Sequence, residues 1–271
     1  MNPANGSIGV FDSGIGGLSV ANAISRLLPR ESVLYVADNG RAPYGPQSAA
    51  AILAYSREIT AALLASGAKM IVVACNTATA IAIDTLRNEY PKVPFVGMEP
   101  AIKPAAEGNR IGVLATAATL GSERYLALKN RYLSEQEVLE DACIGLVPVI
   151  EAEAPGSLRL RERLKNILTP MIAKGIDTLV LGCTHYPMVQ ADIAAVCGQG
   201  VRIIDPSDAA AKQVARLLPY PFVGTSGRAH NFYCTGDSTS LQRALLGLPD
   251  LNVARALVVP NLKLKNHHDE G

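Results

Sequence analysis

Two of the five cysteines stand where a thiol could do acid–base chemistry. Cys75 follows the apolar run Met70–Ala74, and Cys183 closely follows a similar run, Thr178–Leu181. Such uninterrupted apolar runs are typical of parallel strands that are covered by helices on both faces, and ligands bind beyond the carboxyl ends of these strands. For the other three cysteines, burial as a small hydrophobe is the ordinary explanation. Cys75 and Cys183 are therefore candidate catalytic residues.

An internal repeat places the two thiols at equivalent points of two half-chains. The triplet Ile-Gly-Val occurs at 8–10 and again at 111–113, and the segment ending at Cys75 resembles the one ending at Cys183. The second copy follows the first by 103 residues for the triplet and by 108 residues for the cysteine segment, so the two offsets are nearly equal. Repeated βαβ units also resemble each other for general physical reasons, which is the simpler explanation. If two such halves face each other across a pseudo-twofold axis, each presents one thiol to the cleft between them.

Two thiols on opposite sides of one carbon atom could invert its configuration. One thiolate would remove a proton from one face while the other thiol delivers a proton to the opposite face. The ordinary pKa of cysteine, about 8.5, is closer to neutrality than that of lysine or tyrosine. The Cα–H of an amino acid is a very weak acid, so the site must also stabilise charge developing on the carboxylate. Asn76, Thr77 and Thr184 follow the two cysteines at expected helix starts and could do so.

Two further side chains could share a proton with the thiols. His185 is two residues after Cys183, and Asp12 ends the first expected strand. The glycine-rich turn 12–17 resembles a phosphate or dinucleotide loop but lacks the full fingerprint, so it is weak support for a nucleotide. The polar loop 38–45 is either an ordinary turn or part of the site.

Strands alternate with helices along the chain, which favours parallel sheets built from βαβ units. The expected strands are 8–11, 32–37, 70–74, 95–97, 110–115, 138–144, 178–181, 202–204, 231–234 and 255–259. The expected helices are 17–28, 48–66, 78–89, 122–132, 158–174, 187–197, 206–218 and 238–246. The fold class is therefore α/β, with two similar domains and an active site in the cleft between them.

Composition excludes several classes of protein. The chain has 271 residues, of which 49% are hydrophobic, and a net charge of +1. This length suits one large or two small domains. There is no basic stripe for nucleic acid, no apolar run of about 20 residues for a membrane span, and no secretory signal in 1–7. We expect a cytoplasmic protein with reduced thiols and no disulfide framework, which binds neither nucleic acid nor membrane.

Seven segments, in order along the chain, closely resemble the motifs of the glutamate racemase family, within the wider aspartate/glutamate racemase group. They are FDSGIGG (11–17), ADNGRAPYG (37–45), ACNTA (74–78), the T-x-x-T-x-x-S stretch 116–122, VPVIE (147–151), GCTHYP (182–187) and FYCTGD (232–237). They span nearly the whole chain, and in this order they are highly specific.

The resemblance implies racemisation of L- and D-glutamate without pyridoxal phosphate, metal or other cofactor. Cys75 would serve the D-enantiomer with help from Asp12, and Cys183 would serve the L-enantiomer. His185 and Glu151 would assist Cys183. The implied substrate contacts are Asp12, Ser13, Pro43, Tyr44, Gly45, Asn76, Thr77, Thr116, Thr119, Thr184 and His185.

The resemblance also implies a biological setting and a domain division. Family members supply D-glutamate for peptidoglycan, and hence for cell-wall biogenesis and cell shape, in the bacterial cytoplasm, and they often form homodimers. Residues 1–98 with 206–271 would form one domain, and residues 99–205 the other.

Three departures from the family pattern bear on the site. Ala115 stands where the family usually has glycine. Glu153 lies two residues from Glu151, so either carboxylate could be the one that assists. The first expected strand, which leads into the first motif, begins at residue 8, whereas members activated by a peptidoglycan precursor have a longer N-terminal extension, so we expect no such activation.

Other functions remain open on the residues alone. A cysteine hydrolase or amidase with Cys183 as nucleophile would use His185 but leave Cys75 idle, and a spacing of two residues suggests poor nucleophile–base geometry. A zinc site formed by Cys75, Cys183 and His185 lacks the usual CxxC-type spacing. A binding protein would hold glutamate without exchanging its α-proton. Pyridoxal phosphate is disfavoured because Lys69 and Lys174 are not at motif strand ends.

Overall fold

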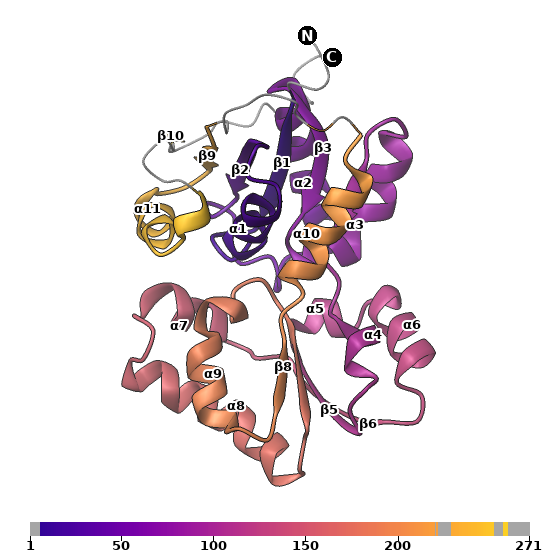
Figure 1. Cartoon of the computed structure of the whole chain (residues 1–271), viewed down its shortest axis with the longest axis vertical. Helices are drawn as coiled ribbons and strands as arrows, with labels where there is room; N and C mark the ends of the chain where they lie inside the picture. The colour runs from indigo at the N-terminus through magenta and orange to yellow at the C-terminus, as the bar shows by residue number, and fades with distance from the viewer. Residues whose placement is uncertain (1–5, 220, 222–228, 252–256, 260–271) are drawn as a thin grey trace. The chain divides into compact units, whose positions relative to one another are not determined.

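The computed structural model describes residues 6–219, 221, 229–251 and 257–259. The chain divides into two compact units, residues 1–98 with 207–271 and residues 99–206. Each unit contains a parallel sheet with helices packed against it (Figure 1). The expected α/β class with parallel sheets is confirmed.

The first unit is built on a six-stranded parallel sheet in the order β10-β9-β2-β1-β3-β4. Helices α2 and α3 cover one face through apolar side chains such as Ile59 and Ile83, and α1 and α10 lie side by side over the other face (Figure 1). Its strands are β1 (Ser7–Asp12), β2 (Val33–Ala37), β3 (Ala68–Val73), β4 (Phe95–Gly97), β9 (Asn231–Cys234) and β10 (Leu257–Val259). Its helices are α1 (Leu18–Leu27), α2 (Ala49–Ala65), α3 (Asn76–Glu89), α10 (Ser207–Leu217), α11 (Thr239–Leu246) and the 3-10 helix η3 (Pro249–Leu251).

The second unit has a four-stranded parallel sheet in the order β6-β5-β7-β8. One face packs against α7, α8 and α9, and the other packs against α4 and α6. Its strands are β5 (Arg110–Ala115), β6 (Glu137–Asp141), β7 (Thr178–Gly182) and β8 (Arg202–Ile204). Its helices are α4 (Ile102–Ala105), α5 (Ala117–Leu120), α6 (Glu123–Tyr132), α7 (Leu146–Ala152), α8 (Leu158–Ala173), α9 (Gln190–Cys197) and the 3-10 helix η2 (Tyr186–Val189).

The two sheets repeat the same local topology. The order β2-β1-β3-β4 of the first unit recurs as β6-β5-β7-β8 in the second. The registers also correspond, because Ile8 is opposite Met70 in one sheet and Ile111 is opposite Thr178 in the other. The internal repeat inferred from the sequence is therefore confirmed, and the two candidate thiols follow equivalent strands.

Most expected elements lie within two residues of the observed ones, and the exceptions have local causes. The strand expected at 138–144 ends at Asp141, because Cys143 has a positive φ of 50° that a strand does not accommodate. The helix expected at 187–197 is instead η2 followed by α9. Helices α4, α5 and α7 escaped prediction because segments this short show no clear periodicity. The strand expected at 255–259 begins outside the described residues, and 257–259 form β10.

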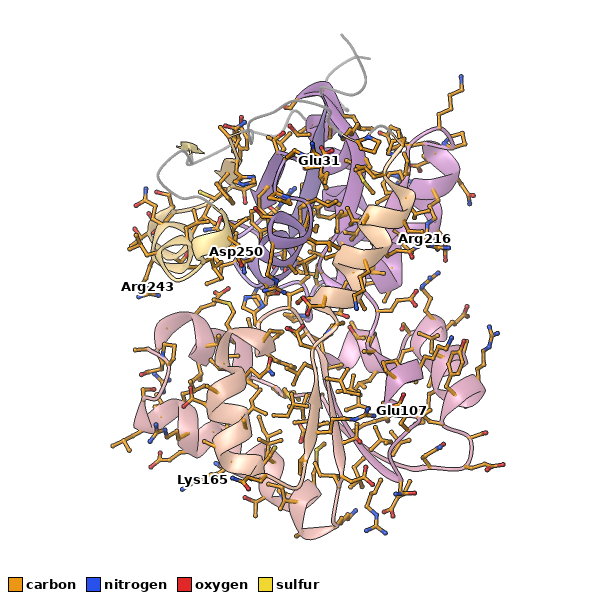
Figure 2. All side chains as sticks on the ribbon, in the orientation of Figure 1. Glu31, Glu107, Lys165, Arg216, Arg243 and Asp250 are labelled. Carbon is orange, nitrogen blue, oxygen red and sulfur yellow. The ribbon has the colours of Figure 1, made fainter. Side chains whose placement is uncertain are left out.

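The segment after the second unit is tied into the first sheet through a buried histidine. The backbone N–H of Val33 donates to His230 Nδ1 at 3.0 Å, and His230 Nε2 lies 3.3 Å from Ser25 Oγ. Ser25 in turn donates to the carbonyl of Asp250 at 2.6 Å, beside α1 (Figure 2). Burial lowers the pKa of His230, which favours the neutral ring that this acceptor role requires.

Among the described residues, no helix is both long enough and apolar enough to cross a bilayer.

Candidate functional site

Cys75 lies at the junction of β3 and α3 and caps the helix with its sulfur. The backbone N–H of Ala78 donates to Cys75 Sγ at 3.4 Å, and the thiol donates to Ser13 Oγ at 3.7 Å. The sheet register explains this proximity, because Phe11 and Val73 are opposite each other shortly before the two strands end. Both the N–H donor and the N-terminal end of α3 favour negative charge on this sulfur.

Asn76, the first residue of α3, presents a buried amide group. The residue is only 4% exposed. Among the described residues, neither Asn76 Nδ2 nor Oδ1 has a hydrogen-bond partner. An unpaired buried polar group costs about 1–3 kcal/mol, and such groups call for an explanation in terms of a ligand, an ion or a water. The amide can donate to a carboxylate and accept from an ammonium, the two polar groups of an α-amino acid.

Asp12 organises the glycine-rich turn. Its carboxylate is fully buried and accepts the backbone N–H groups of Gly14 and Gly17, each at 3.1 Å. A side chain at Gly17 would place its Cβ 2.6 Å from the Cβ of Asp12, so glycine is required by close approach. The turn is therefore folded around an internal carboxylate, which an open phosphate loop would not contain. Assistance of Cys75 by Asp12 stays a prediction.

The loop after β2 is held by Asp38, whose side chain is 0% exposed. The Tyr44 hydroxyl and the Arg41 guanidinium both donate to this carboxylate. Burial, followed by the charge of Asp38, raises the pKa of Tyr44, so its hydroxyl stays protonated. Part of the loop is thus held by hydrogen bonds to a buried side chain. The predicted substrate contacts on this loop are Pro43, Tyr44 and Gly45.

In the second unit, Cys183 is the first member of a chain of three polar side chains. Cys183 Sγ lies 3.9 Å from His185 Nδ1, and His185 Nε2 lies 2.8 Å from Glu151 Oε1. Glu153 is engaged instead by Arg159 at 3.2 Å. Of the two carboxylates left open by the sequence, Glu151 is therefore the one beside the histidine. At 3.9 Å the sulfur–imidazole contact is long even for a sulfur hydrogen bond, in line with the poor geometry expected from the two-residue spacing.

Three threonines of the second unit, Thr116, Thr119 and Thr184, lie at the same edge of its sheet. Ala115 is opposite Gly182, so Thr116 and Cys183 leave neighbouring strands together. Thr116 Oγ1 caps α5 by accepting the Thr119 N–H at 3.3 Å, and the two hydroxyls are 3.0 Å apart. The predicted residues found at this edge are Thr116, Thr119, Cys183, Thr184 and His185.

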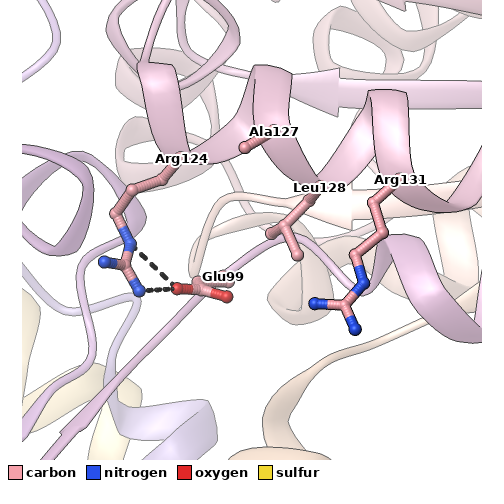
Figure 3. Close-up of a pocket in the computed structure, with 5 residues that line it drawn as sticks. All are labelled: Glu99, Arg124, Ala127, Leu128 and Arg131. Atoms are coloured by element: carbon pink, nitrogen blue, oxygen red, sulfur yellow. Dashed lines mark hydrogen bonds and ion pairs between the residues drawn. The ribbon is translucent and has the colours of Figure 1, made fainter.

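A separate cavity lies against α6 in the second unit. It has a volume of about 240 Å³, and Glu99 accepts hydrogen bonds from Arg124 on its wall (Figure 3). None of the predicted site residues lines it. Its lining residues are Glu99, Arg124, Ala127, Leu128 and Arg131. In the part of the chain that the structure describes, no group of three or more His, Cys, Asp or Glu is arranged to hold a metal ion.

Comparison with known proteins places the chain in a family. A model described as Asp/Glu/Hydantoin racemase matches residues 8–214. The chain belongs to the Asp/Glu/Hydantoin racemase family. This chain is 46% identical over 250 residues to the glutamate racemase of Ectopseudomonas mendocina (strain ymp), an alignment that covers 90% of this chain and 95% of that relative. The family resemblance read from the motifs is confirmed, as is the expectation of an isomerase of this family.

Solved structures of other members of the racemase family share the fold. Escherichia coli glutamate racemase in complex with L-glutamate and the activator UDP-MurNAc-ala superposes with a TM-score of 0.83 at 33% identity, over 96% of this chain and 99% of that one. Glutamate racemase from Francisella tularensis in complex with D-glutamate gives a TM-score of 0.82 at 30% identity, over 97% and 100% of the two chains.

Within this racemase-family chain, sequence reasoning did not single out Asp38, Arg41 or Thr235, although they lie in the loop 38–45 and the motif 232–237. Asp38 and Thr235 each follow a strand directly, which was the available signal. Their hydrogen bond joins positions 197 residues apart, and no local pattern indicates such a pairing.

Proposed function

We propose that this chain interconverts L- and D-glutamate by a cofactor-independent two-base mechanism in which Cys75 and Cys183 are the bases. The observation that carries the proposal is the repeated geometry of the two thiols. Each follows the equivalent strand of a sheet with the same strand order, and each is nearly buried, at 5% and 8% exposed. Relatives named glutamate racemase, and solved neighbours that hold L- or D-glutamate, support this substrate.

In the L-to-D direction, the Cys183 thiolate removes the α-proton, and the Cys75 thiol delivers a proton to the opposite face of the planar carbanion. One proton leaves the carbon and one arrives, so the reaction needs no oxidant or co-reactant. His185 is oriented by Glu151 so that Nδ1 faces the Cys183 sulfur, and it can hold the proton that this thiol would otherwise keep. The reverse direction exchanges the roles of the two thiols.

Substrate binding follows from the polar groups around each thiol. We place the α-carboxylate near the N-terminal end of α3, where the unpartnered amide of Asn76 is available. Donors there stabilise the charge that develops when the α-proton leaves. The remaining contacts proposed are Asp12, Ser13, Pro43, Tyr44, Gly45, Thr77, Thr116, Thr119, Thr184 and His185.

The assembly and role of the enzyme are part of the same proposal. Each of the two compact units supplies one thiol, Cys75 from residues 1–98 with 207–271 and Cys183 from residues 99–206. The enzyme acts in the cytoplasm as a homodimer and supplies D-glutamate for peptidoglycan.

Turnover in heavy water tests the two-base mechanism. In single-direction turnover, the product should carry solvent deuterium at Cα while recovered substrate stays largely unlabelled, because separate groups remove and deliver the proton. Mass spectrometry of the separated enantiomers measures both pools. Equal labelling of substrate and product would indicate a single base and contradict the proposal.

A second candidate, amide hydrolysis, is favoured by one specific observation. The Cys183–His185–Glu151 chain has the order of a nucleophile, a base and an orienting carboxylate. With glutamine as substrate, a hydrolase releases ammonia, whereas a racemase conserves mass. Ammonia release that disappears in Cys183→Ala but survives in Cys75→Ala would replace the racemase proposal.

Glu151 should matter for turnover, while Glu153 should not. Glu151→Gln should lower kcat/KM by about a hundredfold, the lower range of general acid–base assistance, because His185 loses its negatively charged partner. Racemisation has an equilibrium constant of one, so the loss must be equal for the two enantiomers. Glu153→Gln is the matched control, since its carboxylate bonds to Arg159. Circular dichroism of glutamate follows both variants, and equal losses in both would refute the assignment of Glu151.

A further inference from the structure

Four neighbouring strands of the first unit end in a row of polar side chains. Ala37 is opposite Cys234 in one strand pair and opposite Asp12 in the next. From the β9 side inward, the residues just beyond the first three strands are Thr235, Asp38 and Ser13, and Cys75 lies two residues beyond β3. The row therefore links the candidate thiol to a segment that follows the whole second unit in sequence.

Asp38 is the centre of this row. Its Oδ1 accepts Thr235 Oγ1 at 2.7 Å and Arg41 Nε at 2.9 Å. Its Oδ2 accepts Arg41 Nε at 2.8 Å and also the Tyr44 hydroxyl. A carboxylate without solvent exposure is tolerated when it is paired and fully hydrogen-bonded, as this one is. Removing one donor would therefore disturb the whole arrangement.

Hydrogen bonds connect two turns beside the Asp38 carboxylate. Thr235 Oγ1 also accepts the Gly40 N–H at 3.0 Å. Asn39 Oδ1 accepts the Gly236 N–H at 2.9 Å, and Asn39 Nδ2 donates to the Asp237 carbonyl at 2.6 Å. A Cβ at Gly40 would lie 3.0 Å from the Thr235 backbone, so glycine is needed for this approach. These hydrogen bonds thus hold the turns 38–41 and 235–237 in a fixed arrangement relative to each other.

The other side of the loop is held by α2. The Tyr44 and Tyr55 rings are 5.7 Å apart between centroids, and the Arg41 guanidinium lies 4.0 Å above the Tyr55 ring. Arg41 Nη1 also contacts Glu58 at 2.6 Å. Tyr44 is therefore fixed through its ring by α2 and through its hydroxyl by Asp38.

We propose that Asp38 and Thr235 are positioning residues for glutamate: they fix the turn 41–45, so that substrate affinity depends on the segment 235–237. The inference rests on the proposed function, in which Pro43, Tyr44 and Gly45 contact the substrate. These contacts lie outside the proton-transfer steps and act equally on bound substrate and transition state. Loosening the turn therefore raises KM and leaves kcat nearly unchanged, because part of the binding free energy is then spent on ordering the turn.

The test uses the full chain with the isosteric substitution Thr235→Val. KM for both enantiomers should rise about tenfold, while kcat stays within about twofold of wild type, since one charge-assisted hydrogen bond and the Gly40 contact are lost. Thr235→Ser keeps the hydroxyl and should restore a wild-type KM. Thr85→Val, at a half-buried threonine of α3, is the matched control and should change neither constant. Thermal unfolding is recorded for each variant.

The outcomes separate this inference from the proposed function. A wild-type KM in Thr235→Val, or a lower melting temperature with no change in KM, would overturn the positioning role and leave the racemase proposal standing. Wild-type protein that does not racemise glutamate would overturn both. If Thr235→Val does not fold, Asn39→Ala makes the same test, because it removes the hydrogen bonds from the turn 38–41 to the turn 235–237. An increased KM in Asn39→Ala supports the inference, and an unchanged KM overturns it.

Discussion

Alanine at either Cys75 or Cys183 should lower kcat/KM for glutamate racemisation by about a thousandfold in both directions. Each substitution removes one of the two groups that exchange a proton with Cα, and such a group contributes roughly 10²–10⁴-fold. The loss is equal for the two enantiomers because the equilibrium constant of racemisation is one. Circular dichroism of glutamate over time measures the rate in each direction.

The matched control for this experiment is Cys197→Ala. Cys197 and Cys183 are each 8% exposed and belong to the same apolar core, so the two substitutions remove similar packing. Cys197→Ala should keep full activity. The far-ultraviolet circular dichroism of all three variants should match wild type, which separates loss of chemistry from loss of fold. Full activity in Cys75→Ala or Cys183→Ala would refute the two-thiol assignment.

The strands that carry the thiols could be predicted because their physics is local. An apolar run such as 178–181 is readable as a covered parallel strand from composition alone. The repeat then placed Cys75 and Cys183 at equivalent strand ends, and the observed registers agree. Each of these inferences needs only neighbouring residues or a constant offset between two copies.

The supporting contacts could not be predicted because they join distant or competing residues. Glu151 and Glu153 are two positions apart, and only the fold of α7, a helix of seven residues, decides which of them meets His185. Asp38 and Thr235 meet through strand pairing between β2 and β9, which no segment of the sequence encodes by itself. Side chains that position a site therefore escape prediction more readily than the chemical groups they serve.

The largest effect on stability is expected at the buried ion pair between Lys69 and Glu31. Lys69 Nζ lies 2.7 Å from Glu31 Oε2, and each side chain is only 4% exposed. Glu31 precedes β2 and Lys69 is near the start of β3, at the end of the sheet opposite Cys75 (Figure 2). Lys69→Met should lower the free energy of unfolding by about 3–5 kcal/mol, because it leaves the Glu31 carboxylate buried without its counter-ion. Urea denaturation measures this loss.

A second substitution separates the two possible causes of this loss of stability, the unpaired Glu31 charge and the lost packing of the lysine side chain. In the double variant Lys69→Met with Glu31→Leu, most of the lost stability should return, because a buried ion pair replaced by apolar side chains of similar volume is often neutral or stabilising. Arg57→Met, at an ion pair with Glu89 in which Arg57 is 47% exposed, should change stability little, since solvent screens that pair. If the double variant is no more stable than Lys69→Met, the penalty lies in lost lysine packing rather than in the orphaned charge. Catalytic constants should stay at wild-type values throughout, because the pair lies at the end of the sheet opposite Cys75.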